Sequence, residues 1–400
     1  MNELEAIRSA YKSARARGLR MALATVVGVE GSAYRRPGAH MLMTESGETC
    51  GTISGGCLER DVLERAAEVM STRAARLIEY DTRGQEDIVW GLGMGCNGVV
   101  RVLLESLHEE GAGALALRFV ADCLSARRSG VCATVIANEK KGQSDDVKVG
   151  ARLLLDERLD VCGGSLTSHR LAARVREDAL EVLAGKVAAV RSYETGAGRV
   201  EIFFDLIRPP RPLVIFGAEH DALPLVSQAR VLGWHVTVVD TRARRASLER
   251  FACANEVVLC RAAEVSARVS LTENTAAVVM THNYLDDLEL LRALLPSPAC
   301  YLGLLGPQQR TQKLLAELKA ETGWPSDAPH ARLHSPVGLD IGAETPEEIA
   351  LAIVAEIKAV CAARGGGFLR DRDAPIHDAA ASAPALAQDE SAMLYACRLS

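Results

Sequence analysis

The spacing of hydrophobic positions in the first half of the chain changes repeatedly between helical and strand periods. Apolar residues recur at helical spacing over 4–14, and a near-continuous apolar run follows over 21–29. This pattern predicts a helix that leads into a buried strand. Helical spacing returns over 58–70. Shorter extended segments are predicted at residues 40–44, 48–53, 76–80, 98–104, 147–155 and 200–204. Residues 1–207 are therefore expected to form a mixed α/β amino-terminal domain, and no repeat of solenoid length is visible.

A proline-rich linker is predicted at 208–212, where three prolines in four positions favour extended backbone. Beyond it, short β runs alternate with helical patterns, which predicts a Rossmann-like doubly wound parallel sheet over 213–364. The strands are expected at 213–216, 235–239, 256–259, 276–280 and 300–304, and the helices at 221–232, 285–295 and 308–320. The segment Thr345–Glu348 has the capping-box pattern that begins a last helix. Alanine-rich residues 365–400 are expected to form a mobile tail.

Composition excludes several classes of partner. The net charge of −6, from 46 basic and 52 acidic residues, removes the attraction on which phosphate-backbone binding depends, so no nucleic acid is expected. No apolar run reaches the ~20 residues of a membrane span. The odd count of 11 cysteines and a beginning that carries Glu3 and Glu5 favour reduced thiols in the cytoplasm over a secreted disulfide framework.

Two cysteines lie in glycine-rich turns that could form a binding site. Cys57 follows Ser54, Gly55 and Gly56 at the expected start of the 58–70 helix, where the positive end of the helix dipole favours a reactive thiolate that binds soft metals. Cys96 follows Gly95 in a second glycine-rich turn, and such turns can direct several backbone N–H groups at one anion. The other nine cysteines are expected to be inert.

A third loop of small residues carries Arg35 and Arg36, whose guanidinium groups could hold a phosphate. Together with the two turns, it could hold an anionic ligand that contains sulfur or a metal. The chain has no CxxC pair, no phosphate loop of the GxxxxGK[ST] type and no GxSxG elbow. Structural zinc, kinase and hydrolase functions are therefore not expected.

The strand predicted at 213–216 runs into a turn that partly matches a dinucleotide-binding fingerprint. Gly217, Ala218 and Ala222 occupy this turn, and Asp240 ends the next predicted strand near the usual position of a ribose-binding acid. Glu219 stands where the fingerprint needs its second glycine, so NAD(P) binding is doubtful. A Rossmann-like sheet without a dinucleotide is an equally good interpretation.

Polar residues also follow other strands of the same predicted sheet. His220, Asp221, His282 and Asp287 could converge on one crevice at the carboxyl ends of the strands and take part in acid–base chemistry or metal binding. Helix capping at loop ends is the stronger alternative, because no HxH or HExxH spacing joins these residues to a metal. No metal site is assigned.

Several motifs together resemble the XdhC/CoxI family, the xanthine dehydrogenase accessory factors. The motifs are Gly31–Ala39, Ile53–Val62 and Gly93–Gly98 in the first half, and Phe216–Ala222, Met280–Asn283, Gly303–Pro307 and Pro336–Ala350 in the second. The resemblance covers roughly residues 20–365 in the right order. The chain departs from the family pattern at Glu219 and Asn283.

The resemblance implies a maturation factor that binds molybdenum cofactor transiently and supports its sulfuration with a cysteine desulfurase. It also implies delivery of the cofactor to xanthine dehydrogenase or a related molybdenum hydroxylase. Two other hypotheses stay open: an NAD(P)-dependent oxidoreductase, and a Rossmann-like half that only mediates dimerisation or partner docking. A homodimer is the default expectation for a protein of this kind.

Overall fold

The computed structural model describes residues 3–31, 33–81, 98–109, 111–139, 147–166, 169–185, 187–195, 198–242, 249–322, 331–373 and 376. The chain divides into two compact units between Pro209 and Pro210, inside the proline-rich segment. No helix among these residues is long and apolar enough to cross a membrane.

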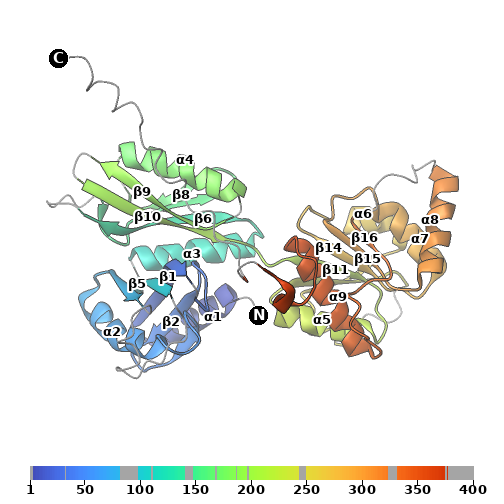
Figure 1. The fold of residues 1–400 in the computed structure, drawn as a ribbon, viewed down its shortest axis with the longest axis horizontal. Helices are drawn as coiled ribbons and strands as arrows, with labels where there is room; N and C mark the ends of the chain where they lie inside the picture. Colours follow the sequence, from blue (N-terminus) through green and yellow to red (C-terminus); the bar gives the residue numbers. More distant parts are fainter. Residues whose placement is uncertain are drawn as a thin grey trace, which may run out of the picture. The chain divides into compact units, whose positions relative to one another are not determined.

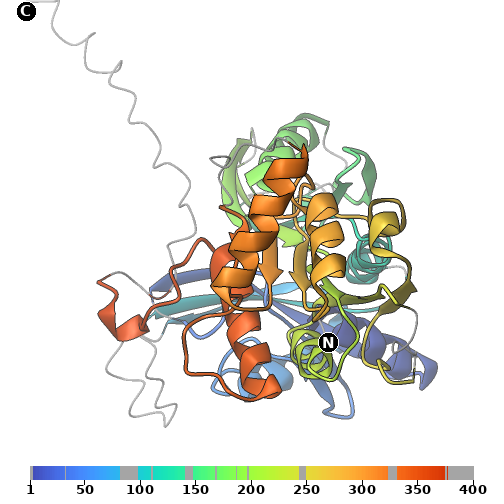
Figure 2. The same ribbon diagram turned by 90° about the vertical axis from the view of Figure 1, so that its right-hand side faces the viewer.

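The carboxy-terminal unit is built on a six-stranded parallel sheet with helices on both faces (Figures 1 and 2). In spatial order the strands are β13 (Glu256–Leu259), β12 (His235–Asp240), β11 (Pro212–Phe216), β14 (Ala276–Val279), β15 (Tyr301–Leu304) and β16 (Leu333–His334). This order confirms the predicted Rossmann-like doubly wound sheet. The strand order reverses between β11 and β14, which is where ligands bind in sheets of this kind.

Alternating side chains along β11 explain why both faces of this sheet are covered. Leu213 and Ile215 pack with α5 and α9, whereas Val214 and Phe216 pack with helices on the opposite face. The helices are α5 (Ala222–Val231), α6 (Val265–Arg268), α7 (Tyr284–Leu294), α8 (Gln308–Thr322) and α9 (Pro346–Cys361). The predicted capping box at Thr345 is confirmed, since its side chain accepts the N–H of Glu348 and the Glu348 side chain returns the bond.

The amino-terminal unit contains two antiparallel five-stranded sheets. In spatial order, the first holds β3 (Thr49–Gly51), β2 (His40–Thr44), β1 (Met21–Gly31), β5 (Gly98–Ser106) and β4 (Arg76–Asp81). The second holds β8 (Val161–Gly164), β7 (Arg152–Asp156), β6 (Gly130–Asn138), β10 (Gly198–Ile207) and β9 (Ala189–Thr195). The helices are α1 (Glu3–Ala16), α2 (Glu59–Thr72), α3 (Ala112–Ser125) and α4 (His169–Gly185). Helix α2 packs on the first sheet, α4 packs on the second, and α3 lies between them (Figure 1).

The strand predicted at 147–155 is shorter than expected. Its first part is a turn, in which Gly150 has a φ of 89° and the N–H of Ala151 donates to the carbonyl of Lys148. Strand β7 therefore begins only at Arg152. The prediction was wrong here because Val147, Val149 and Ala151 alternate with other residues as they would in a strand. In the structure these three residues lie next to the Gly150 turn instead.

The two sheets repeat one another element by element. A helix, three strands, a second helix and two strands occur twice, and both sheets have the same strand order. Both central strands have a bulge at the equivalent residue, Val27 in β1 and Ile136 in β6. We call residues 3–106 the first repeat and residues 112–207 the second repeat. This duplication was not predicted from the sequence, although Gly38-Ala39 and Cys50-Gly51 recur as Gly150-Ala151 and Cys162-Gly163 at the same spacing.

The two repeats contact each other through reciprocal ion pairs. Arg152 of β7 pairs with Glu105 of β5, and the Nε2 atom of His40 in β2 lies 3.1 Å from an oxygen of Asp205 in β10. His40 and Arg152 are equivalent as the first residues of β2 and β7, and the two acids are equivalent in β5 and β10. Each repeat thus supplies one basic and one acidic side chain to the contact. This is the pattern of a twofold-symmetric interface, which is formed here within one chain.

The His40–Asp205 pair makes stability depend on pH. Burial opposes the charge on His40, but attraction to Asp205 outweighs it and raises the pKa of the imidazole above its ordinary value of about 6.5. The stabilisation is therefore fully present below about pH 6.5 and is lost as the pH rises through the folded-state pKa. In urea unfolding, we expect the difference in unfolding free energy between the wild type and His40→Gln to shrink from pH 6 to pH 9. A difference that does not vary with pH would contradict this assignment, and His282→Gln, at an exposed histidine, is the control.

Candidate functional site

The predicted thiol site is a braced turn between β3 and α2. The Oγ atom of Ser54 accepts the N–H groups of Gly56 and Leu58, each at 3.1 Å. These two hydrogen bonds restrain the backbone of 54–58. Cys57 is exposed at the tip of this turn. The thiol is thus presented to solvent on a preorganised loop.

Glu59 holds the turn from its other side. Its carboxylate accepts hydrogen bonds from the Thr52 hydroxyl at 2.7 Å, from the Ser54 N–H at 2.8 Å and from the Ser54 hydroxyl. Burial opposes ionisation of this acid, but the hydrogen bonds from Ser54 and Thr52 outweigh it and hold the pKa of Glu59 below its usual range. Glu59 is therefore ionised at neutral pH and fixes the turn as an acceptor. This role was not predicted from the sequence, although a glutamate after a serine-containing turn is the signal of a capping interaction.

The position of Cys57 relative to the helix differs from the prediction. Helix α2 begins at Glu59 with Leu58 as its N-cap, so Cys57 lies just outside the helix rather than at its start. Ser54, four residues before the N-cap, supplies the acceptor that fixes the path of the chain into the helix. The favoured thiolate at Cys57 stays a prediction.

The loop that carries the two arginines lies beside this turn. A Cβ atom on Gly55 would stand 3.5 Å from the ring of Tyr34, which is itself 69% exposed. Arg35 forms an ion pair with Glu3, whereas no ion pair of Arg36 is found within the described part of the chain. The two arginines therefore differ in their contacts, although nothing in the sequence distinguishes them. The anion-binding role of Arg36 stays a prediction.

Two other predicted residues, Gly95 and Cys96, lie outside the described residues. The neighbouring backbone is described, since Gly98 pairs with Gly31 at the end of β1. The role assigned to Cys96 stays a prediction.

In the carboxy-terminal unit, Gly217 stands at the switch point of the sheet. Its φ is 134°, and a Cβ atom there would lie 2.4 Å from the carbonyl oxygen of Met280 in the adjacent segment. Ala218 is buried, and Ala222 begins α5. Asp240 ends β12, but its carboxylate already accepts the N–H of Arg242 at 2.9 Å. Position 217 therefore needs a glycine because the ends of β11 and β14 approach each other closely there.

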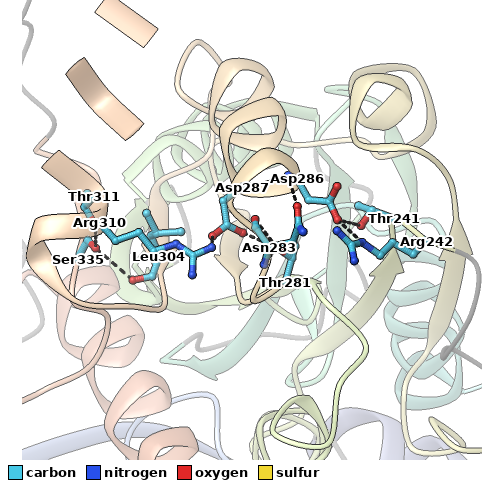
Figure 3. Close-up of polar contacts among 10 residues, drawn as sticks. All are labelled: Thr241, Arg242, Thr281, Asn283, Asp286, Asp287, Leu304, Arg310, Thr311 and Ser335. Carbon is cyan, nitrogen blue, oxygen red and sulfur yellow. Dashed lines mark hydrogen bonds and ion pairs between the residues drawn. The ribbon is translucent and has the colours of Figure 1, made fainter. Parts of the chain in front are cut away.

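Three of the four predicted crevice residues interact, because His282 contacts Asp221 and its charge also acts on Asp287. His282 lies with Nε2 2.7 Å from an oxygen of Asp221, across the switch point, while His220 is exposed. Asp287 is only 1% exposed, and it accepts hydrogen bonds from Thr281 and Arg310, each at 2.5 Å (Figure 3). No group of three metal-ligating side chains occurs among the residues that the structure describes.

A polar network that was not predicted from the sequence follows the same sheet edge (Figure 3). Asp286 accepts from Arg242 at 2.7 Å and from Thr241 at 3.3 Å, and Arg310 reaches Asp287 from α8. Burial raises the pKa of Asp287, although Thr281 and Arg310 act in the opposite direction. These pairs join Thr241 and Arg242, which follow β12, to the start of α7, and α7 to the start of α8. The signal in the sequence was only a polar residue at each strand end.

Comparison with known proteins gives matches in both units. A family model described as the XdhC Rossmann domain matches residues 213–357. A second, described as the XdhC and CoxI family, matches residues 14–81 and 123–194. The two segments of the second match lie one in each repeat of the amino-terminal unit.

Two relatives and one solved structure span most of the chain. A Bacillus subtilis protein named as a probable subunit of xanthine dehydrogenase is 32% identical over 335 residues, which cover 84% of this chain and 91% of that protein. The molybdenum cofactor insertion chaperone PaoD of Escherichia coli is 24% identical over 338 residues, covering 84% and 82%. A crystal structure described as a xanthine dehydrogenase from Bacillus halodurans is 30% identical, with a TM-score of 0.71 and coverage of 91% and 97%.

Proposed function

Because the chain belongs to the XdhC and CoxI family, we propose that it is an accessory chaperone that binds molybdenum cofactor and inserts it into a recipient enzyme. The relative named as a molybdenum cofactor insertion chaperone supports this activity, and the relative named for xanthine dehydrogenase supports a molybdenum hydroxylase as recipient. The observation that carries the proposal is the Ser54–Glu59 turn. It presents an exposed thiol, and the loop that carries Arg36 approaches the same turn where the Tyr34 ring lies next to Gly55.

The groups at this turn fit the chemistry of the cargo. Molybdopterin carries a phosphate and a metal bound to a dithiolene, so a carrier needs a soft ligand near an anion-binding group. The thiolate of Cys57 is the soft ligand, and the guanidinium of Arg36 together with the backbone of Gly55 suits the phosphate, whereas the N–H of Gly56 already donates to Ser54. A preorganised turn lowers the ordering cost of binding.

The sulfuration step and the partners extend this proposal. While the cofactor is held, a cysteine desulfurase supplies the sulfur that replaces an oxo ligand, and the cofactor then leaves for xanthine dehydrogenase or a related hydroxylase, so binding is transient. We place these steps in the cytoplasm, where thiols stay reduced. The free state of the nine cysteines that the structure describes supports this choice. A homodimer stays a prediction.

The NAD(P)-dependent oxidoreductase considered from the sequence is not favoured. Glu219 stands where a pyrophosphate needs glycine, and the Asp240 carboxylate is bonded to its own loop. The relatives that span both units point to a role in molybdenum enzyme maturation instead.

The thiol is tested by replacing Cys57 with alanine. After incubation with a cofactor source and desalting, we expect Cys57→Ala to retain about tenfold less molybdenum per chain than the wild type, the usual order of loss when a contact to a metal site is removed. Molybdenum is measured by mass spectrometry, and the pterin by fluorescence after oxidation. The matched control is Cys162→Ala, which removes an exposed cysteine of the second repeat. Equal retention by both variants would remove Cys57 from the site.

The same assay separates the two arginines. Arg36→Ala is expected to weaken retention because it removes the phosphate contact, whereas Arg35→Ala breaks only the ion pair to Glu3. Equal losses for the two variants would contradict this division.

A further inference from the structure

Two cysteines that were expected from the sequence to be inert meet at one edge of the parallel sheet. Cys300 directly precedes β15 and Cys361 ends α9, and their sulfur atoms lie 4.0 Å apart. Both side chains are partly exposed. A disulfide needs about 2 Å between the sulfur atoms, so a small rotation of either side chain suffices to form one. The edge is the amino-terminal one, opposite to the switch point and its polar network.

Charged groups around the pair favour one thiolate and one thiol. The guanidinium of Arg211, which precedes β11, places Nη1 3.9 Å from the Cys300 sulfur. The hydrogen bond from Cys361 and the charge of Arg211 outweigh burial and lower the pKa of Cys300 to about 6. The pKa of Cys361 is raised by the same hydrogen bond, although Arg211 and Lys358 act against this. The Cys300 sulfur also contacts the carbonyl oxygen of Thr275 at 3.3 Å, which accepts its proton in the neutral form.

We propose that Cys300 and Cys361 are a reactive dithiol, with Cys300 as the attacking thiolate and Cys361 as the resolving thiol toward small-molecule disulfides such as glutathione disulfide. Cys300 attacks one sulfur of the disulfide, whose S–S bond breaks and releases one thiolate. Cys361 then gives its proton to solvent and attacks the Cys300 sulfur, which releases the second thiolate and leaves an intramolecular disulfide. Two protein thiols are oxidised, and one small disulfide is reduced to two thiols. The resulting bond joins α9 to the start of β15 and closes a long loop.

The reaction is followed on the full chain with glutathione disulfide at pH 7. Remaining free thiols are trapped with a maleimide, and peptides are identified by mass spectrometry. In the wild type we expect the 300–361 cross-linked peptide and no retained glutathione on either residue. Cys361→Ser should keep one glutathione on Cys300, because the resolving thiol is absent. Cys300 of this variant should react about tenfold faster than exposed Cys253, because the Arg211 guanidinium 3.9 Å from its sulfur still favours the thiolate.

Further variants separate chemistry from folding. Arg211→Gln should slow the reaction of Cys300, whereas Arg211→Lys should keep most of it, and thermal unfolding under reducing conditions shows whether each variant folds. The oxidised wild type should unfold at a higher temperature than the reduced protein, and oxidant should not shift Cys300→Ser. Glutathione that stays on Cys300 of the wild type would overturn the proposal. Slower reaction at Cys300 than at Cys253 would overturn it as well.

Discussion

Replacing Glu105 with alanine is expected to destabilise the amino-terminal unit by about 3–5 kcal/mol, because it leaves the guanidinium of Arg152 buried without its carboxylate. Each side chain of this pair is only 4% exposed, so the guanidinium has little contact with water. Burial opposes the charge on Arg152, but Glu105 outweighs it and holds the pKa of Arg152 above its ordinary value. Urea unfolding of the whole chain, with the amino-terminal transition followed by circular dichroism, measures the loss.

A rescue variant and a surface control define this effect. Glu105→Leu combined with Arg152→Met removes both charges and should recover most of the stability lost in the single variant, since a buried pair is often replaced by apolar residues at little cost. Glu48→Ala is the control, because Glu48 pairs with Arg17 at a half-exposed site and its loss should change stability little. A small effect of Glu105→Ala would show that Arg152 is not held by this carboxylate.

Replacing Gly217 with alanine is expected to destabilise the carboxy-terminal unit by about 3 kcal/mol, through backbone strain and a direct clash. The added Cβ atom would stand 2.4 Å from the carbonyl oxygen of Met280, at a φ of 134° that residues with side chains rarely adopt. Because the carbonyl group of Met280 belongs to the backbone, rotation of a side chain cannot relieve the clash. Differential scanning calorimetry should show a lower melting temperature for the carboxy-terminal transition.

The matched control for Gly217 is Gly365→Ala in the same unit. A Cβ atom on Gly365 meets nothing within 4 Å, so this change should alter stability by less than about 0.5 kcal/mol. Similar melting temperatures for both variants would mean that the β11 and β14 ends separate easily. The switch point would then be a flexible opening instead of a rigid junction.

The regular half of the fold was predictable because its strands are buried on both faces. In β11, four consecutive apolar residues from Leu213 onward are needed to contact helices on either side, and such a run is visible without the structure. Strand β16 escaped notice because it has only two residues, neither of them fully buried. The antiparallel half was harder, since β7 and the Gly150 turn share one apolar pattern.

The turn at Cys57 was predicted from the sequence, but the contacts that hold it were not. Glycines next to Cys57 marked the turn, yet the brace formed by Glu59 depends on side-chain hydrogen bonds that no spacing reveals. The same limit applies to Arg35 and Arg36, which differ only because Glu3 lies beside one of them. Cys300 and Cys361 are 61 positions apart, and only the packing of α9 against the sheet brings them together.

The duplicated body of the amino-terminal unit has a consequence for how its binding turn could diversify. In a symmetric dimer every substitution appears twice, so a loop cannot change on one side alone. Here the two halves share one chain, and the second repeat passes from Gly164 to α4 through Ser165-Leu166-Thr167-Ser168, without the glycine pair or the cysteine of the first. Within one chain, the turn that carries Cys57 can therefore change in the first repeat without a matching change in the second.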